Sequence, residues 1–496
     1  MSKHISKYLH QQMDKETGIS HSQKRTKIIA TVGPASDSFE KLLELAKAGV
    51  NVFRLNFSHG SHENKKAVID HIRKINKSQP FNIAILADLQ GPKLRVGELT
   101  DGQIELMDGG EIIFTTEKSV GTSEKIYVSY PNLTTDVKVG ERIFLDDGKM
   151  EVMVKKILND KEVLVGITLG GTLLQKKGVN LPDSELTMPS LTEKDYIDLD
   201  FIIEQNLDWI ALSFVRKPKD IIELKKIIND RHSKIKVIAK IEMPEALKNI
   251  RDIIVESDGI MVARGDLGVE MPVEQVPIIQ KELIRKSMHR AKPVIVATQM
   301  MESMMDRTKP NRSEVSDVAN AVMEGADAVM LSGETAMGEY PVQVVEMMCR
   351  IILEVEKTVY DYNRDDILAP QPHSPSFISD AICYSACKLA HDTNAKALVG
   401  MTQSGYTAFM LSSYRPNAPL YIFSKERSLI GQLSLSWGVR AFYYAEEESL
   451  DDIIFDQINI LKERGYLKSG DVVVNTGSTP VELHLSTNIV KVTTVD

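Results

Sequence analysis

Charged side chains stand two apart in one strand-like run of the chain, and a third follows the next run. Lys240 and Glu242 flank Ile241, so an extended chain points both to the same side. Asp266 follows the run from Gly259 to Ala263 and adds a second carboxylate. One or two protein carboxylates plus substrate oxygens form a typical magnesium site. The spacing therefore predicts a magnesium ion that holds an anionic substrate. The alternatives are a buried Lys240–Glu242 salt bridge and a helix N-cap at Asp266.

Other groups at the ends of neighbouring runs extend this chemistry. Arg54 lies in an otherwise apolar run, where an arginine is costly unless it binds an anion. Gly265 leaves backbone N–H groups accessible beside Asp266, which suits a carboxylate or phosphate. Thr298 is either an oriented hydroxyl or a core threonine bonded to its own backbone. His59 is a weak signal, because loop histidines are common.

Alternating β-branched runs and amphipathic stretches must position these residues, and this alternation indicates β-α units around a parallel sheet. Eight strands are expected, which is the number of a closed (β/α)8 barrel with its functional groups at the C-terminal strand ends. The expected strands are Lys27–Val32, Val52–Phe57, Ile83–Asp88, Trp209–Phe214, Lys236–Ile241, Gly259–Ala263, Pro293–Ala297 and Ala326–Leu331.

The barrel pattern is interrupted once and followed by a second pattern. Turn signals and short alternating runs predict an inserted antiparallel β-barrel domain that acts as a lid. A proline-containing linker then leads to an α/β domain with strands near 397–401, 420–423, 439–443, 471–475 and 489–492. The expected boundaries are an N-terminal segment 1–24, barrel 25–92, insertion 93–189, barrel 190–360, linker 361–376 and C-terminal domain 377–496.

Composition narrows the function classes. A chain of 496 residues with 43% hydrophobic and 26% charged residues is expected to form several globular domains, and no uninterrupted apolar run offers a membrane span. The net charge of −9 argues against nucleic acid as a partner. Three cysteines favour a reducing compartment, with Cys383 and Cys387 as core residues. The polar, basic N-terminus is neither a signal peptide nor an anchor, so a cytoplasmic location is expected.

Six motifs in order resemble the pyruvate kinase family over nearly the whole chain. They are Ile28–Pro34 (IIATVGP), Arg54–Gly60 (RLNFSHG), Lys177–Pro182 (KGVNLP), Met261–Glu270 (MVARGDLGVE), Ala297–Met300 (ATQM) and Ser332–Ala336 (SGETA). The resemblance implies a usually tetrameric, allosteric glycolytic enzyme that transfers the phosphoryl group of phosphoenolpyruvate to ADP.

The resemblance also implies roles for individual residues. Glu242 and Asp266 would bind Mg²⁺ (or Mn²⁺), Lys240 and Arg54 would hold the phosphoryl group, amides at Gly265 and Asp266 would hold the carboxylate, and Thr298 would lie near the carbon that is protonated. The nucleotide, with a second magnesium, would meet Asn56, His59, Arg95 and Lys177, and Asp147 would join when the lid closes.

Two departures concern a monovalent cation and an effector. Many relatives have glutamate at the position of Lys93 and bind potassium through residues matching Asn56, Ser58 and Asp88, so Lys93 implies activity without potassium. The loop Thr402, Gln403, Ser404, Gly405 and Thr407 has the layout of a phosphate-binding nest for an effector, or is an ordinary capped loop. The segment Gly477–Thr487 lacks the glycines and the basic residue that often complete a fructose 1,6-bisphosphate site in the family, so a monophosphate or nucleotide is expected instead.

Two other function classes are weighed against this one. Lys240 could form a Schiff base as in aldolases, but a neighbouring carboxylate favours a charged ammonium. A degenerate, non-catalytic relative would be expected to have lost at least one of Arg54, Lys240, Glu242, Asp266 and Thr298, and all five are present.

Overall fold

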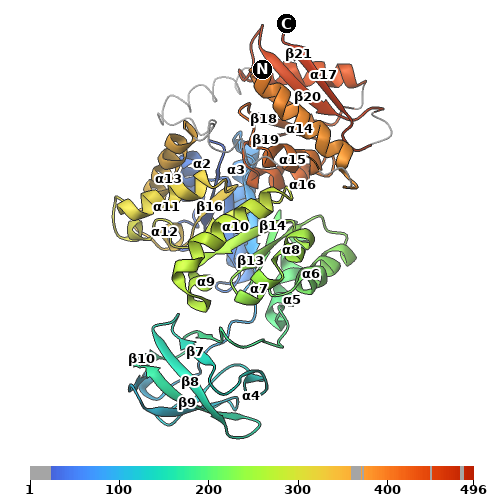
Figure 1. The fold of residues 1–496 in the computed structure, drawn as a ribbon. Helices are drawn as coiled ribbons and strands as arrows, with labels where there is room; N and C mark the ends of the chain where they lie inside the picture. The colour runs from blue at the N-terminus through green and yellow to red at the C-terminus, as the bar shows by residue number, and fades with distance from the viewer. Residues whose placement is uncertain (1–23, 359–369, 371–373, 447–448, 481–484) are drawn as a thin grey trace.

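The computed structural model describes residues 24–358, 370, 374–446, 449–480 and 485–496. It has a central barrel, an inserted β domain below it and a C-terminal domain above it (Figure 1). The predicted N-terminal segment lies outside the described residues apart from Lys24. Most of the predicted linker, and residues 481–484 of the segment after Gly477, also lie outside them.

Eight parallel strands close into a barrel, as predicted. They are β1 (Lys27–Thr31), β2 (Val52–Asn56), β3 (Ala84–Asp88), β12 (Trp209–Leu212), β13 (Lys236–Ile241), β14 (Gly259–Ala263), β15 (Val294–Ala297) and β16 (Ala328–Leu331). Six are one or two residues shorter than expected. The strand ends of β12 and β15 are followed by left-handed residues, Phe214 (φ 53°) and Thr298 (φ 68°), which cannot continue a strand.

Helices surround the barrel, and several of them begin at capping residues. The barrel helices are α2 (Phe39–Ala48), α3 (His62–Ser78), α5 (Glu193–Glu204), α6 (Pro218–Asp230), α7 (Pro244–Lys248), α8 (Ile250–Glu256), α9 (Arg264–Glu270), α10 (Val276–Met288), α11 (Arg312–Met323), α12 (Gly333–Ala336) and α13 (Pro341–Glu356), with short 3-10 turns η2 (Val273–Gln275) and η3 (Glu302–Met305). Ser38 and Ser61 cap α2 and α3 through their hydroxyls, and Thr192 with Asp195 forms a capping box on α5. Their apolar faces pack on the barrel strands to form the main core.

The inserted domain has its own hydrophobic core and follows β3. A six-stranded sheet has the order β11 (Val179–Asn180), β7 (Arg142–Leu145), β8 (Met150–Ile157), β9 (Glu162–Leu169), β5 (Glu111–Thr115) and β6 (Lys125–Tyr127), and β10 (Gly171–Leu174) pairs with β4 (Gln103–Leu106). The short helices η1 (Thr100–Gly102) and α4 (Leu133–Asp136) complete it. The pairing is antiparallel as expected except between β5 and β6. Nine residues separate those two strands rather than a tight turn, which permits a parallel return.

The C-terminal domain is a five-stranded sheet with helices on both sides, and all five expected strands are present. The order is β19 (Val439–Tyr443), β18 (Leu420–Ser424), β17 (Ala397–Met401), β20 (Val472–Gly477) and β21 (Ile489–Thr494), with only β21 antiparallel. The helices are α14 (Phe377–Asp392), α15 (Tyr406–Ser413), α16 (Arg427–Gln432), η5 (Leu433–Leu435) and α17 (Leu450–Glu463). Cys383 and Cys387 on α14 pack in its core, as expected.

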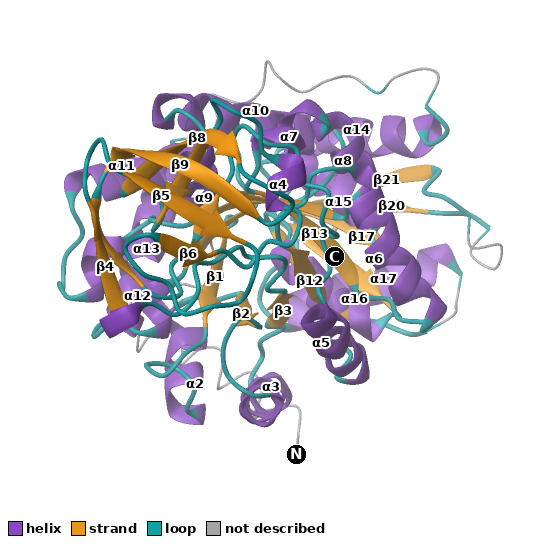
Figure 2. Ribbon diagram, turned by 90° about the horizontal axis from the view of Figure 1, so that it is seen from below, coloured by secondary structure: helices purple, strands orange, loops and turns teal. Residues whose placement is uncertain are grey.

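The two smaller domains lie at opposite ends of the barrel. The indole N–H of Trp209, the first residue of β12, donates to the Gln432 carbonyl of the C-terminal domain (3.2 Å), so that domain covers the N-terminal strand ends. The inserted domain lies beyond the other end, with β5, β8 and β9 in front of the barrel in Figure 2. No helix among the described residues has the length and apolar character needed to cross a bilayer.

Candidate active site

Lys240 lies at the C-terminal end of β13 with three oxygen partners. Its ammonium nitrogen is 2.8 Å from Glu242 Oε1 and 3.2 Å from Asp88 Oδ1, and it donates to Ser213 Oγ at 2.7 Å. The Ser213 hydroxyl in turn donates to the Leu89 carbonyl (2.8 Å). The lysine side chain is 12% exposed, so one side of the ammonium still faces the opening of the barrel. The strand pattern correctly placed Lys240 and Glu242 on one side of β13.

Asp88 joins this lysine to Arg54. Arg54 Nε donates to Asp88 Oδ2 (2.7 Å), and Arg54 NH1 donates to the Thr31 hydroxyl (2.9 Å). Asp88 is buried, with its two oxygens shared between an arginine and a lysine. The carboxylate therefore holds two cations side by side at the mouth of the barrel, where they can face one anionic ligand.

Burial and neighbouring charges determine the ionisation states of Lys240 and Asp88. Burial alone would lower the pKa of Lys240, but Asp88 and Glu242 outweigh it and raise that pKa. Burial opposes ionisation of Asp88 too, yet the charges of Lys240 and Arg54 lower its pKa. Lys240 is thus an ammonium and Asp88 a carboxylate at neutral pH. A charged Lys240 argues against Schiff-base chemistry, which needs a free amine.

Glu242 and Asp266 have the character expected of divalent-cation ligands. Burial raises the pKa of Glu242, Lys240 opposes this, and the nearby charge of Asp266 adds to it. Glu242 Oε2 also accepts the Phe214 amide (2.7 Å). Two carboxylates that repel each other in a buried site are stabilised by a cation, so the residues fit Mg²⁺. Within the described residues no group of three or more His, Cys, Asp and Glu side chains could hold a metal, so substrate and water would supply the remaining ligands.

Asp266 lies in the first turn of α9 rather than at its N-cap position, which Ala263 occupies. The N-cap alternative for Asp266 is therefore wrong. Leu267 is buried on the same helix, so the helix packs against the barrel through this neighbour while Asp266 remains only half-buried. This leaves the carboxylate accessible to a ligand.

The Thr298 hydroxyl is hydrogen-bonded from two sides, in both cases to a backbone group. The Gly265 amide donates to Thr298 Oγ1 (2.7 Å), and the hydroxyl donates to the Ala297 carbonyl (2.6 Å). Arg264 donates to the Thr298 carbonyl (2.7 Å) and pairs with Asp317 on α11 (2.6 Å). Thr298 keeps its left-handed φ of 68°, unusual for a β-branched residue, under these constraints. In this structure the Gly265 amide is directed at Thr298.

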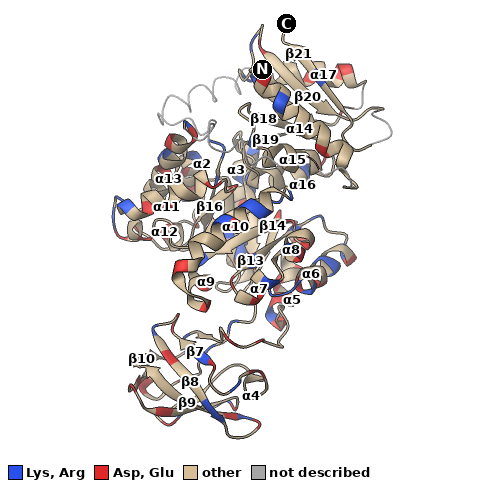
Figure 3. Cartoon of the chain, in the orientation of Figure 1, with Lys and Arg blue, Asp and Glu red and all other residues tan. Residues whose placement is uncertain are grey.

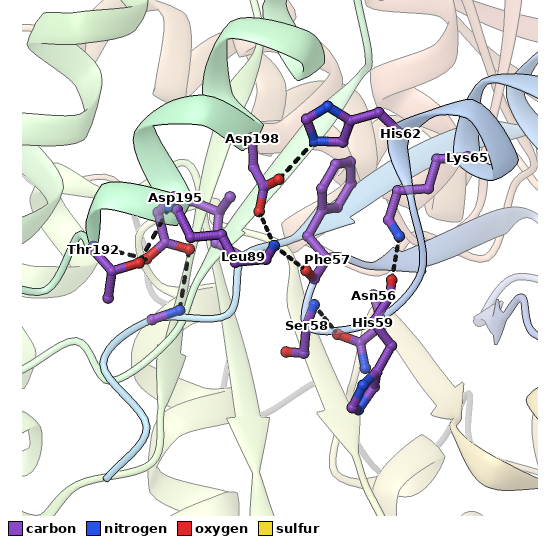
Figure 4. Close-up of polar contacts among 12 residues, drawn as sticks. Asn56, Phe57, Ser58, His59, His62, Lys65, Leu89, Thr192, Asp195 and Asp198 are labelled. Carbon is purple, nitrogen blue, oxygen red and sulfur yellow. Dashed lines mark hydrogen bonds and ion pairs between the residues drawn. The ribbon is translucent and has the colours of Figure 1, made fainter. Parts of the chain in front are cut away.

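Contacts from α5 hold the loop after β2 (Figure 4). Asn56 Oδ1 accepts the Ser58 amide (3.0 Å), and the Lys65 ammonium donates to the His59 carbonyl. Lys194 bridges the Phe57 carbonyl and Asp198 (both 2.6 Å), and Asp198 also contacts His62 Nε2 (2.7 Å). These contacts fix the backbone of the loop, in which Ser58 is half-buried and His59 is exposed.

The other predicted nucleotide residues lie in the inserted domain. Arg95 donates to the Lys176 carbonyl (2.9 Å), and Lys177 pairs with Asp146 (2.8 Å). In the described part of the chain, the hydrogen bonds and ion pairs of Arg95 and Lys177 stay within that domain. Asp147 adopts a left-handed turn (φ 56°) beside Gly178. The structure therefore does not pair these residues with Asn56 and His59.

Lys93 lies where the inserted domain meets the barrel. A cavity of about 30 Å³ is lined by Lys93, Asn180, Asp266 and Glu270, among others. Asn180 Nδ2 donates to Glu270 Oε1 (2.6 Å) across this junction. Lys93 therefore shares a cavity with one predicted metal ligand. Lys93 follows the same strand as Asp88, whereas Asn56 and Ser58 lie at the end of β2.

The hydroxyls of the predicted effector loop are all hydrogen-bonded, one of them to Thr487 outside the loop. Thr402 Oγ1 accepts the Gly405 amide (3.1 Å), Ser404 Oγ accepts the Tyr406 amide (3.3 Å), and Thr407 shares a hydrogen bond with Thr487 (2.6 Å). Gln403 is exposed between them. The loop opens α15 with Gly405 in the left-handed region (φ 89°), the layout expected of a nest or of a capped loop.

Several supporting residues could not be identified as such from their motifs. Ser213 contacts Lys240 and Asp88 although its own segment contains no charged neighbour to mark it. Asp88 was expected at a cation site, yet its observed partners are Arg54 and Lys240. Arg264 was visible only as part of a motif, and its partner Asp317 lies 53 residues away.

Comparison with known proteins identifies the chain's relatives. Family models for "Pyruvate kinase, barrel domain" and "Pyruvate kinase, alpha/beta domain" match residues 23–345 and 380–493. Pyruvate kinases of Geobacillus stearothermophilus and Staphylococcus aureus (strain USA300) are 43% identical over 474 and 471 residues, which is 95% of this chain and 80% of each relative. A crystal structure of a Cryptosporidium parvum pyruvate kinase superposes with a TM-score of 0.90 at 35% identity, covering 97% of this chain and 99% of that one. With the conserved order of domains and the charged strand ends described above, these matches show that the chain belongs to the pyruvate kinase family of phosphotransferases.

Proposed function

We propose that this enzyme transfers the phosphoryl group of phosphoenolpyruvate to ADP, with Lys240, Arg54, Glu242, Asp266 and Thr298 at the reacting centre. The observation that carries the proposal is the pair of cations, Lys240 and Arg54, held by one buried carboxylate at the mouth of the barrel. Two fixed cations suit a phosphoryl group whose oxygens carry negative charge during transfer.

Each residue has a task that follows from its position. Arg54 binds and orients the phosphoryl group, and Lys240 neutralises its charge while it moves between oxygens. Glu242 and Asp266 would hold Mg²⁺, which when bound supplies positive charge to the phosphoryl and enolate oxygens. Thr298, fixed by Gly265 and Ala297, would orient the proton delivery to the enolate carbon, with water between.

The nucleotide is assigned to Asn56, His59, Arg95 and Lys177, with a second magnesium arriving on ADP. This assignment needs the inserted domain to move toward the loop after β2, because Arg95 and Lys177 belong to that domain. The Asn180–Glu270 hydrogen bond lies at the junction where such a movement would occur.

We also propose that no potassium is needed. Lys93 lines the cavity beside Asp266, and the Asp88 carboxylate is already balanced by Arg54 and Lys240. A fixed ammonium can supply the positive charge that relatives with glutamate at this position take from potassium. Ser58 and Asp88 would then serve structure and Asn56 the nucleotide, and none of the three would need to bind a monovalent cation.

Further proposals concern the setting of the enzyme. We propose a cytoplasmic homotetramer whose effector loop, 402–407, takes a phosphorylated effector, with fructose 1,6-bisphosphate having little effect. Among the described residues of the segment from Gly477, no lysine or arginine precedes Lys491, which supports the last point.

The decisive experiment is ATP formation from phosphoenolpyruvate and ADP, with and without magnesium. It is run in tetramethylammonium and in potassium buffers. We expect magnesium-dependent ATP formation at similar rates in both buffers. No ATP with magnesium present would overturn the transferase proposal, and activity that appears only with potassium would overturn the cation proposal alone.

A further inference from the structure

A large cavity lies between the barrel and the C-terminal domain, remote from the active site. Its volume is about 900 Å³, and its walls come from α8, α10 and α11 on one side and α14 and α15 on the other. It opens near the N-terminal ends of the barrel strands, whereas Lys240 and Asp266 lie at the C-terminal ends. None of the residues assigned above to substrate, nucleotide or metal lines it.

The walls of this cavity are strongly basic, although the chain carries a net charge of −9. Among the described residues, seven lysines and arginines line it against two carboxylates; the basic residues are Arg251, Lys281, Arg285, Lys286, Arg290, Lys292 and Arg415. Figure 3 marks the basic positions along α10, which contributes three of the seven. Such a concentration of one sign of charge attracts anions.

Most of this charge is not balanced by neighbouring acids. Arg415 pairs with Asp327 (2.9 Å) and Lys286 with Glu282 (2.6 Å). Lys292 is bound to the Ser257 carbonyl (2.6 Å), which leaves its charge unbalanced by this contact. The other four basic residues, Arg251, Lys281, Arg285 and Arg290, form no ion pair with any residue that the structure describes.

The two carboxylates of the cavity are engaged elsewhere. Glu324 accepts a hydrogen bond from Gln280 (2.7 Å), and Asp380 accepts one from Ser376 (2.9 Å) and one from the Tyr406 hydroxyl. Glu324 is nevertheless close enough for the charge of Lys281 to oppose the burial that raises the pKa of Glu324, so this carboxylate offsets part of the positive charge. An anionic ligand would meet an excess of arginine and lysine donors, the groups that bind phosphate most strongly.

The cavity also offers apolar surface from both domains. Met288 and Met323 line it from the barrel, and Tyr406, Met410 and Tyr414 line it from the C-terminal domain. A volume of about 900 Å³ is within the range of pockets that take whole metabolites and is far larger than a phosphate ion. Tyr406 is 40% exposed, so part of its ring is available to stack against a flat group.

We propose that this cavity is a second ligand site that binds a phosphate monoester with a flat, partly apolar body, of the nucleoside monophosphate class. Its phosphate meets Lys281, Arg285 and Arg290, and its body packs between the methionines of the barrel and the tyrosines of the C-terminal domain. Binding itself does not depend on the proposed transferase function.

A ligand here would hold the two domains in one arrangement. α10, which carries Lys281 and Arg285, follows α9 and its Asp266 after a turn of five residues. α15, which carries Tyr406, begins directly after the effector loop. The site therefore lies between α10, which follows the helix of a predicted metal ligand, and α15, which follows the effector loop. A ligand bound there raises the thermal stability of the whole chain.

The test is calorimetric titration of the full chain with AMP, with adenosine and inorganic phosphate in parallel. We expect saturable AMP binding, at least tenfold weaker binding of both fragments and a higher melting temperature with AMP. Lys281→Ala/Arg285→Ala weakens AMP binding at least tenfold. Lys226→Ala/Arg312→Ala, which removes the same two charge types from exposed positions outside the cavity, leaves it unchanged.

Three outcomes would overturn the proposal. The first is an absence of AMP binding. The second is binding that survives Lys281→Ala/Arg285→Ala, which would assign it to the ADP site. The third is binding lost equally in Ser404→Ala, which would place it at the effector loop. ATP formation by the double variant without AMP should equal that of the wild type. This separates a failure of the second site from a failure of the transferase proposal.

Discussion

Lys240 remains an ammonium in a buried position because Asp88 and Glu242 face it from two sides. Their charges more than offset the cost of burial, so the lysine pKa is raised rather than lowered. Both carboxylates are buried: Asp88 is the last residue of β3, and Glu242 directly follows β13. The residue is therefore a fixed positive charge and not a base.

Replacing this charge tests its role directly. Lys240→Met keeps most of the side-chain volume, and we expect kcat for ATP formation to fall at least 10²–10³-fold, on the scale of losing one charge-stabilising donor. Magnesium binding, followed by Mn²⁺ electron paramagnetic resonance, should persist because Glu242 and Asp266 remain. Lys236→Met is the matched control, since Lys236 begins the same strand at the opposite end of the barrel. Equal losses in both variants would show a structural effect instead.

Lys93 offers a second test at the scale of one side chain. Lys93→Glu replaces a positive charge beside Asp266 with a negative one, so the site should then need an external cation. We expect activity in tetramethylammonium buffer to fall at least tenfold and potassium to restore most of it. Lys93→Met, which removes charge without reversing it, should show a smaller dependence. A Lys93→Glu enzyme indifferent to potassium would contradict the assignment.

At the scale of elements, the candidate site lies at the strand ends. Some of its side-chain contacts could be predicted from the sequence and others could not. Period-two spacing places Lys240 and Glu242 together without any tertiary information. The Asp88–Lys240 contact could not be foreseen, because β3 and β13 are separated by β12 and their levels depend on the barrel register. The Arg264–Asp317 pair depends likewise on how α11 packs beside α9.

Glu270, at the junction between β11 and α9, is expected to make the folding stability depend on pH. Glu270 is buried, its Oε2 has no hydrogen-bond partner among the described residues, and burial raises its pKa to about 7, with Asp266 and Glu242 adding to the effect. The folded protein then holds this proton more tightly than the unfolded chain, whose carboxyl titrates near 4.5. The resulting stability is complete below about pH 4.5 and is lost as the pH rises through about 7.

Glu270→Gln removes this titration and keeps an oxygen to accept from Asn180. In EDTA, the wild type should lose more apparent melting temperature between pH 5 and pH 8 than the variant does. In free energy of unfolding, the wild type should lose on the order of 2–3 kcal/mol at most more than the variant, since one pKa unit is about 1.4 kcal/mol. Because all other groups are common to both proteins, the comparison isolates Glu270. Identical pH profiles would show that Glu270 keeps an ordinary pKa.

At the scale of the whole molecule, three bodies with their own cores meet along the barrel axis. The inserted domain is joined to the catalytic end through a few polar contacts such as Asn180–Glu270 and Arg216 with the Leu186 carbonyl (2.7 Å). The C-terminal domain is joined more firmly, with Trp209 and the Arg415–Asp327 pair buried between it and the barrel. Movement is therefore expected chiefly of the inserted domain, which agrees with its proposed role as a lid.

The close fit of the C-terminal domain can be tested at Gly431 on α16. A Cβ at this position would overlap the carboxylate of Asp208, which is fixed because it accepts the Ile85 amide (2.8 Å) in a half-buried position. Gly431→Ala should therefore lower the apparent melting temperature, with a cost of about 1–3 kcal/mol for overpacking. In the Asp208→Ala background, Gly431→Ala should lower the apparent melting temperature less than it does in the wild type, because the overlapping group is gone. Strictly additive effects of the two substitutions would show that Gly431 and Asp208 do not touch.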